Sequence, residues 1–180
     1  MSINVRDARL SEADRLWIEG VYRDYLDDLA PLNTGVFPAL GEVGHREPDQ
    51  VAHWFADPQA HPLVIAEAAE RVGFALVVRS SGAAASTGAA ASSGAGAPRY
   101  RMAEFFVSRP SRGRGIGRGA ARLILDRFAG RWEIVEYLRN PGAVQFWRRV
   151  VSGYTQGRFE ERVVNGEVRQ VFESARRSGA

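Results

Sequence analysis

Glycine and arginine alternate in one stretch of the chain, Arg112-Gly-Arg-Gly-Ile-Gly-Arg118, which runs directly into a segment of helical periodicity. Glycine lets a ligand approach the backbone without meeting a Cβ atom, and the free N–H groups at the start of a helix attract anions. The arginines add positive charge at the same place. We therefore expect this turn to bind a phosphate group, with a flexible basic turn as the alternative.

Proton transfer is a second chemistry that the sequence offers. Glu104 lies in the apolar run Ala103-Glu-Phe-Phe106, ahead of the turn, and apolar surroundings favour proton uptake by a carboxylate. Glu104 is therefore the candidate general base. A solvent-facing glutamate is the alternative, because its place in a strand does not fix its face. Tyr137 and Tyr154 are further ionisable residues of predicted strands, although aromatic residues in strands are commonly structural.

The composition excludes several other chemistries. The chain has no cysteine and no lysine, so all 24 basic residues are arginines. Disulfides, thiolate metal sites, cysteine nucleophiles, Schiff bases and the lysine-containing phosphate loop are ruled out. His45, His53 and His61 stand eight residues apart, a spacing that fits neither a helical metal motif nor a metal finger. We expect no metal.

The two halves of the chain carry opposite charge. Residues 1–98 hold 7 arginines against 13 acidic residues, a net charge of −6, and residues 99–180 hold 17 arginines against 8 acidic residues, a net charge of +9. The second half should favour an anionic ligand and the first half a cationic one, with two solvated faces as the alternative. Nucleic acid is not expected as a partner, because no aromatic and basic RNA-binding motif occurs and the first half would repel phosphate.

Hydrophobic periodicity predicts the elements that must position these residues. Helices are expected from Ser11 to about Leu29, from Asp49 to Pro58, from Ile116 to Phe128 and from Ala143 to Val151. The first of them should bury Ala13, Leu16, Trp17, Gly20, Val21 and Tyr25, after a capping-box-like start at Ser11 and Asp14. Strands are expected over residues 3–8, 63–68, 72–79, 100–107, 132–138, 154–163 and 167–172, the last two joined by an Asn165-Gly166 turn.

This order predicts an α+β fold with one mixed sheet of seven strands, flanked by about four helices on both faces. One strand–helix–strand step, from Tyr100 to Leu138, requires a parallel crossover. Residues 80–98 contain only Ser, Gly, Ala, Thr and a final Pro. We interpret them as a flexible hairpin loop inside a single domain over residues 1–175, followed by a tail over 176–180. A linker between two domains is the alternative.

The 180 residues suit one domain, and 45% hydrophobic and 25% charged residues are typical of a globular protein. No apolar run is long enough to span a membrane, and the first ten residues lack the pattern of a secretory signal. The sequence therefore predicts a cytoplasmic protein without a membrane partner.

Three known phosphate-binding patterns compete at the glycine turn. Gly115-Ile-Gly-Arg-Gly-Ala120 fits the GxGxxG/A dinucleotide pattern, but that pattern should follow its strand directly, and five residues separate Val107 from Gly113. The lysine-containing loop fails for want of lysine. The spacing Arg112-x-x-Gly115-x-Gly117, after an apolar strand, resembles the [QR]xxGx[GA] pyrophosphate motif of the GNAT superfamily of N-acetyltransferases.

The resemblance extends beyond the turn. These acetyltransferases follow the glycine helix with a strand, an Asn and a short helix of the form A-x-x-F-[YW], and this chain has Asn140, Ala143, Phe146 and Trp147 in that order. The order of elements matches from Ile3 to Phe172. The N-terminal half matches in that order alone, and the family builds the acceptor site from that half, so the identity of the acceptor does not carry over.

The resemblance implies acetyl-CoA bound in a V-shaped opening between the strand ending at Val107 and the strand over 132–138. The residues implied in binding its pyrophosphate, its pantetheine arm and its pocket are Phe105, Val107, Arg112, Gly113, Arg114, Gly115, Ile116, Gly117, Arg118, Asn140 and Phe146. For Phe146, core packing is the alternative. Trp147 departs from the family pattern, since many members place a tyrosine there as the general acid and an indole N–H does not release its proton at useful pH. Tyr137 is therefore the candidate general acid, and Tyr154 is a second one.

We predict a GNAT-like N-acetyltransferase that moves an acetyl group from acetyl-CoA to an amine by direct attack in a ternary complex. The acceptor is a small molecule or a peptide or protein amine, and the sequence predicts neither which of these it is nor the oligomeric state. A non-catalytic acyl-CoA-binding or sensor module is the rival interpretation, and Trp147 is its best support.

Overall fold

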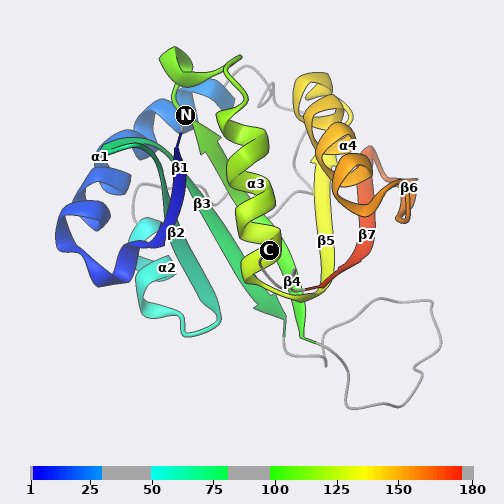
Figure 1. The fold of residues 1–180 in the computed structure, drawn as a ribbon, viewed down its shortest axis with the longest axis horizontal. Helices are drawn as coiled ribbons and strands as arrows, with labels where there is room; N and C mark the ends of the chain where they lie inside the picture. Colours follow the sequence, from blue (N-terminus) through cyan, green and yellow to red (C-terminus); the bar gives the residue numbers. More distant parts are fainter. Residues whose placement is uncertain (1, 30–49, 81–97, 176–180) are drawn as a thin grey trace.

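The structure is a computed structural model that describes residues 2–29, 50–80 and 98–175. Its centre is one seven-stranded sheet in the order β1-β2-β3-β4-β5-β7-β6 (Figure 1). The strands are β1 (Ile3–Asp7), β2 (Ala60–Glu67), β3 (Glu70–Ser80), β4 (Arg99–Val107), β5 (Gly130–Tyr137), β6 (Glu160–Val164) and β7 (Glu167–Ser174). The helices are α1 (Glu12–Leu29), α2 (Gln50–Ala56), α3 (Ile116–Arg127) and α4 (Pro141–Thr155), with short 3-10 turns at Ala8–Leu10 and Arg109–Ser111. The predicted mixed sheet and the predicted order of elements are confirmed.

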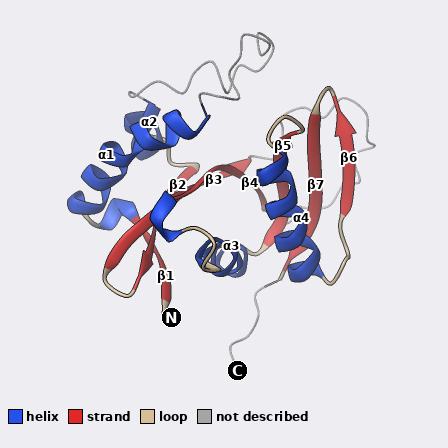
Figure 2. Cartoon of the chain, turned by 90° about the horizontal axis from the view of Figure 1, so that it is seen from above, coloured by secondary structure: helices blue, strands red, loops and turns tan. Residues whose placement is uncertain are grey.

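Helices cover both faces of the sheet (Figure 2). α1 and α2 pack on β2, β3 and β4 through a cluster that includes Tyr22, Trp54 and Phe74. α3 and α4 pack on the opposite face, where Ile124 and Trp147 join the main core. α1 and α4 therefore lie on opposite sides of the sheet.

The buried face of α1 is shifted from the predicted one. Its buried residues are Asp14, Ile18, Tyr22 and Tyr25. Leu16, which periodicity assigned to the core, is 57% exposed. The predicted face was wrong because the position of the helix is set by two features that apolar periodicity does not count. One is the carboxylate of Asp14, and the other is the contact of the Tyr22 and Tyr25 rings with Phe74, at centroid distances of 6.4 and 5.4 Å.

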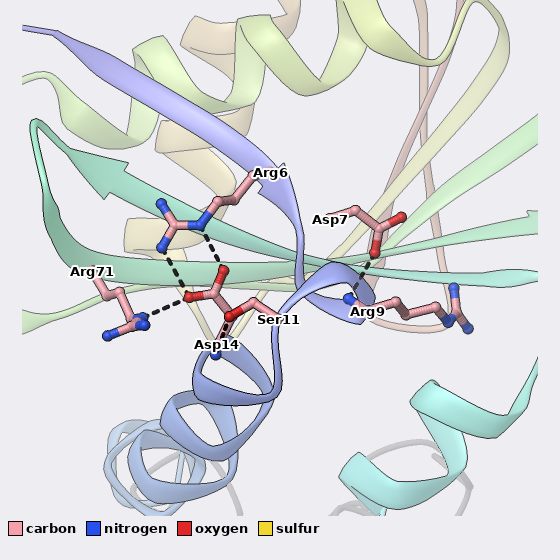
Figure 3. A network of polar contacts seen from close by, with 6 residues as sticks. All are labelled: Arg6, Asp7, Arg9, Ser11, Asp14 and Arg71. Atoms are coloured by element: carbon pink, nitrogen blue, oxygen red, sulfur yellow. Dashed lines mark hydrogen bonds and ion pairs between the residues drawn. The ribbon is translucent and has the colours of Figure 1, made fainter.

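Asp14 holds the start of α1 to the sheet (Figure 3). Arg6 on β1 donates two hydrogen bonds to its carboxylate, at 2.6 and 2.9 Å, and Arg71 on β3 donates a third at 2.6 Å. The hydrogen bond from Arg6, with that from Arg71, keeps the pKa of Asp14 below its usual value although burial acts to raise it. Half of the expected capping box is present, since the backbone N–H of Asp14 donates to Ser11 Oγ, while the Asp14 carboxylate serves these ion pairs instead.

β4 and β5 form the parallel pair, as predicted, but they pair only from Arg99↔Arg131 to Arg101↔Glu133. Beyond these residues each strand continues without pairing to the other, to Val107 in β4 and Tyr137 in β5. The C-terminal ends of the two strands therefore separate. From Met102 onward, the β5-facing edge of β4 has no strand partner in the described structure.

A β-bulge interrupts the pairing of β4 with β3. Leu76 pairs with Glu104 and Val77 with Met102, so Ala103 is an extra residue without an opposite number. An extra residue shifts the alternation of side chains by one position, so each residue after it faces the side of the sheet opposite to the one that regular alternation would give. The bulge places Glu104 on the face covered by α1, and the next residue, Phe105, on the face covered by α3 and α4.

The C-terminal hairpin begins later than predicted. α4 extends to Thr155, so Tyr154 is helical and not part of a strand, and β6 starts at Glu160. The helix continues because Val151 and Thr155 extend its buried face by one more turn. The predicted Asn165-Gly166 turn is confirmed, with φ of 52° and 82° at its two residues.

Residues 81–97, the body of the expected loop, and the tail over 176–180 lie outside the described residues. On either side of residues 81–97, Ser80 pairs with Arg99, so β3 and β4 are antiparallel neighbours in one sheet. Within the described ranges, no helix is long and apolar enough to cross a membrane.

Candidate active site

A cleft of about 930 Å³ opens where β4 and β5 separate. The sequence-predicted residues that line it are Phe105, Val107, Arg112, Gly113, Gly115, Gly117, Arg118, Tyr137, Asn140 and Phe146. Glu104, Arg114 and Ile116 were predicted for the same site, and they do not line this cleft. The structure therefore brings most of the predicted residues together in one place.

The glycine turn is shaped by backbone conformations that favour glycine. Gly113 and Gly115 have φ of 75° and 82°, in the left-handed region where a Cβ atom is costly. Gly115 is the N-cap residue of α3, and no side chain caps the helix there in the described structure. The N–H groups of the first turn of α3 can therefore serve an anionic ligand.

Gly117 has a different role, because it lets α3 approach α4. A Cβ atom on Gly117 would lie 3.3 Å from the ring of Phe146, which is closer than most real Cβ contacts. The third glycine of the turn is thus explained by packing beside the cleft and not by its own φ.

The three arginines of the turn differ in their hydrogen-bond and ion-pair partners. Arg112 donates from Nε to the carbonyl of Val107 at 2.7 Å and pairs with Asp28. Arg114, expected beside the pyrophosphate, pairs with Glu67 of β2 at 2.9 Å. Arg118 lines the cleft and has no ion pair among the residues that the structure describes. Arg118 is therefore the arginine best placed to neutralise a phosphate.

Asp28 ties the end of α1 to this turn. Its carboxylate accepts from Arg109 at 2.8 Å and also from Arg112. Burial acts to raise the pKa of Asp28, but the hydrogen bonds from Arg112 and Arg109 outweigh it and hold that pKa below its usual value. Asp28 is ionised at neutral pH. Its negative charge offsets part of the positive charge of the arginines that were expected to attract a phosphate.

Glu104 meets α1 on the far side of β4. The hydroxyl of Tyr25 donates a hydrogen bond to Glu104 Oε2. Tyr25 lines the cleft, whereas Glu104 is half-buried behind it. Glu104, the predicted general base, therefore lies near the cleft. Tyr25, which was not predicted as a site residue, lies between Glu104 and the cleft.

Three aromatic side chains lie together in the cleft. Phe105 stacks on Phe146 with ring centroids 5.6 Å apart, and Trp147 meets both rings edge-on, at 5.2 and 5.1 Å. Trp147 is buried and donates no hydrogen bond to any described residue. Phe146 therefore packs against other rings, and it also lines the cleft.

Of the remaining predicted residues, Asn140 and Tyr137 line the cleft and Tyr154 lies outside it. Asn140 begins α4, where its Oδ1 accepts from the backbone N–H of Ala143 at 3.1 Å. Tyr137 lines the cleft at the end of β5. Tyr154 donates instead to Asp126 at 2.8 Å, outside this cleft, which removes it as a candidate acid.

Periodicity did not reveal the wall that α1 supplies. Tyr25, Asp28 and Leu29 line the cleft, and their spacing places them on one face of the helix. That spacing indicates a shared face but not what the face meets. Glu136, Gln145 and Arg149 also line the cleft without having been predicted.

The profile of the Acetyltransferase (GNAT) family matches residues 18–151. The matched segment runs from within α1 to within α4 and includes both the glycine turn and the Asn140 to Trp147 motif. The chain belongs to the GNAT acetyltransferase family, and it is a transferase of that type. No curated protein sequence matches it.

Solved acetyltransferases share the fold over almost their whole length. The histone acetyltransferase HPA2 and related acetyltransferase from Corynebacterium glutamicum superposes with a TM-score of 0.63 at 17% identity, covering 99% of this chain and 100% of that one. The PaiA N-acetyltransferase from Thermoplasma acidophilum, in complex with coenzyme A, gives 0.61 at 11% identity, covering 96% and 99%. NAA60 from Arabidopsis thaliana, in complex with acetyl-CoA, gives 0.59 at 14% identity, covering 96% and 99%. At these identities the likeness shows the fold alone, and it confirms the predicted one.

Proposed function

We propose that this protein transfers an acetyl group from acetyl-CoA to an amine by direct attack in a ternary complex. The observation that carries the proposal is the cleft itself, which has a glycine turn with left-handed φ angles at one end and an unpaired edge of β4 along its side. The structures of PaiA with coenzyme A and of NAA60 with acetyl-CoA support the same ligand.

The proposed contacts follow the cleft. The pyrophosphate lies on the N–H groups from Gly113 to Arg118, and the Arg118 side chain adds charge. The pantetheine pairs with the free edge of β4 near Phe105, beside the ring of Phe146. Arg112 acts through Asp28 and Val107 to hold the turn, and Asn140 contacts the cofactor arm while it caps α4.

The reaction needs a neutral amine. An alkyl ammonium has a pKa of about 10.4, so its deprotonation at pH 7 costs about 4.6 kcal/mol. The amine nitrogen then attacks the thioester carbon, a C–N bond forms, and the C–S bond breaks to release the CoA thiolate. The nitrogen loses its second proton as the amide forms, and the thiolate takes up one proton to leave as the thiol. A backbone N–H of β4 is suited to stabilise the oxyanion between these steps. Trp147 cannot protonate the thiolate, but a thiol of pKa about 8.5 is a tolerable leaving group without an acid.

Free thiol released from acetyl-CoA in the presence of small amines, polyamines and peptides with free N-termini tests the proposal. The chain has no cysteine, so a thiol reagent reports CoA alone, and it has no lysine, so no side-chain amine of the protein competes. Amine-dependent release is the expected result. Tight binding of acetyl-CoA by calorimetry without release for any amine would instead favour the non-catalytic sensor module.

The proposal extends to organisation and setting. We place the activity in a single domain over residues 1–175 and in the cytoplasm, and the reaction as written needs no metal. The acceptor class is open between small amines and peptide or protein amines, and the panel of acceptors distinguishes them.

A further inference from the structure

The contact between Tyr25 and Glu104 gives the reaction a route for its proton. Glu104 is the one carboxylate of β4, yet it does not line the cleft. Tyr25 does line it, and the Tyr25 hydroxyl donates to Glu104 Oε2. A proton that leaves a molecule in the cleft can therefore reach Glu104 through the hydroxyl of Tyr25.

We propose that Tyr25 is a catalytic residue that relays the proton of the acceptor amine to Glu104. The proposal rests on the proposed acetyl transfer, and it assigns Glu104 an indirect part, as the final acceptor behind Tyr25. It also gives α1 a chemical role in addition to forming a wall.

The step balances in atoms and charge. An N–H bond of the ammonium breaks as an O–H bond forms on the Tyr25 oxygen, while the original Tyr25 O–H bond breaks and its proton forms an O–H bond on Glu104 Oε2. The ammonium and the carboxylate both become neutral, and Tyr25 ends as the neutral phenol. Glu104 returns to the carboxylate by releasing one proton to solvent per turnover.

The proton affinities suit a relay. The reference pKa of tyrosine, about 10, is close to the value of about 10.4 for an alkyl ammonium. The tyrosine value describes loss of the phenol proton, so the Tyr25 oxygen accepts a proton only as its own proton moves to Glu104. The two transfers are therefore concerted, and neither a phenolate nor a protonated phenol forms. General-base assistance of this kind is worth roughly 10²–10⁴-fold in rate.

Both groups are held by packing and not by the ligand. The Tyr25 ring is 6% exposed and meets the rings of Phe74 and Phe106 edge-on at 5.4 and 5.8 Å. The bulge at Ala103 turns Glu104 toward α1. A relay held in this way needs little rearrangement when an amine binds.

Other ionisable groups also line the cleft. Asp28 of α1 is bonded to Arg109 and to Arg112 of the turn. Glu136 and Tyr137 lie on β5, Arg118 on α3 and Arg149 on α4. These groups are present in every variant compared below, so their titration cancels when the variants are compared with the parent.

The test is a double-mutant cycle on kcat and KM. Tyr25→Phe keeps the packed ring and removes the relay oxygen, and Glu104→Gln keeps size and removes the proton acceptor. Each should lower kcat/KM at pH 7 by about 10²–10³-fold, and the double variant should be no slower than the slower single variant, because both remove the same route. Affinity for acetyl-CoA should be unchanged by calorimetry, and the rates of all three should approach the parent at high pH, where the amine deprotonates unaided.

Tyr154→Phe is the matched control, since it removes another tyrosine–carboxylate hydrogen bond, to Asp126 and outside the cleft. It should keep the parent rate. Full activity of Tyr25→Phe, with Glu104→Gln impaired, would overturn the relay in favour of direct base catalysis while leaving acetyl transfer standing. Independent, additive losses without recovery at high pH would also overturn it. Absence of turnover in the parent for every amine would overturn the proposed function, and the relay with it.

Discussion

The two walls of the cleft differ in what they offer a ligand, because one presents mainly backbone groups and the other presents side chains. The wall made by β4 and the start of α3 offers backbone groups, at a turn whose glycines adopt φ of 75° and 82° and along an edge that pairs with no other described strand. The wall made by α1 offers side chains, and each is fixed by a contact to β4 or to the turn: Tyr25 by Glu104, and Asp28 by Arg112.

Under the proposed function, the first wall binds the cofactor and the second wall binds the acceptor amine. Backbone N–H groups recognise a phosphate whatever the neighbouring side chains are, so the first wall can serve a ligand that is common to a family. Side chains held by long-range contacts can change one at a time, so the second wall can be adapted to one acceptor. Changes to the first wall should alter cofactor affinity, and changes to the second should alter turnover.

Gly115→Glu should break the first wall alone and has the largest expected effect. It places a side chain in a left-handed conformation and a negative charge beside the phosphates, so affinity for acetyl-CoA should fall by roughly 100-fold or more. Calorimetry on the folded variant measures this. Gly153→Glu is the control, because a Cβ atom there meets no atom of the described residues within 4 Å. Equal affinities of the two variants would refute the site, and tighter binding of NAD than of CoA by the parent would restore the dinucleotide interpretation.

Asp14→Asn should weaken the anchor of the second wall. The variant leaves Arg6 and Arg71 without their common partner, and since these arginines are about one-third exposed the expected loss of unfolding free energy at pH 7 is about 2–3 kcal/mol. Urea denaturation measures it. Glu19→Gln, which removes an exposed ion pair with Arg15, should cost less than about 0.5 kcal/mol.

The pH dependence of the unfolding free energy gives a second test of the role of Asp14. The folded-state pKa of Asp14 is lowered, so its stabilisation is complete above the unfolded value of about 3.9 and is lost as the pH falls through the folded value. The parent should therefore lose stability in acid more steeply than Asp14→Asn does. Parallel curves for the two proteins would contradict the assignment.

Two arginines of the first wall should respond differently. Arg118→Met should weaken acetyl-CoA binding by about tenfold, with a reduced dependence on salt, because this guanidinium has no ion pair among the described residues. Arg112→Met should weaken it by only about threefold and should lower stability by about 1 kcal/mol, since its side chain is bonded to Asp28 and Val107. A larger loss of affinity in Arg112→Met than in Arg118→Met would reverse these roles.

Trp147→Phe should have the smallest effect on chemistry. The indole cannot act as an acid, so kcat should stay within about fivefold of the parent between pH 7 and 9, although the smaller ring costs about 1–3 kcal/mol of stability in the core. A loss near 100-fold, with acetyl-CoA affinity intact, would show that the indole N–H takes part in the reaction.

The glycine turn of the first wall and the neighbouring start of α4 could be predicted from sequence because the parts of each are contiguous. The turn from Arg112 to Arg118 and the motif from Asn140 to Trp147 each contain the backbone and side chains that they need within a few residues. The helix after the turn was also predicted, and its buried residues Ile116, Ala120, Ala121, Ile124 and Leu125 follow a regular spacing.

The second wall was not readable in this way. Tyr25 and Glu104 are 79 positions apart, and Asp28 and Arg112 are 84 apart, so only tertiary structure brings each pair together. The shifted face of α1 depends on Asp14, which apolar periodicity counts as a surface residue. Nothing in the segment around Ala103 marks it as the extra residue of the bulge, because the bulge is defined by pairing with β3.

Because of this extra residue, the side chains of β4 alternate between the two faces of the sheet in one phase before Ala103 and in the other phase after it. Before Ala103, residues such as Met102 share a face with the main core, and after it that face passes to Phe105, while Glu104 and Phe106 take the other. Substitution can alter any one of these side chains in place. An insertion or deletion that shifted the pairing of β4 with β3 by one residue beyond Ala103 would exchange the faces of Glu104 and Phe105.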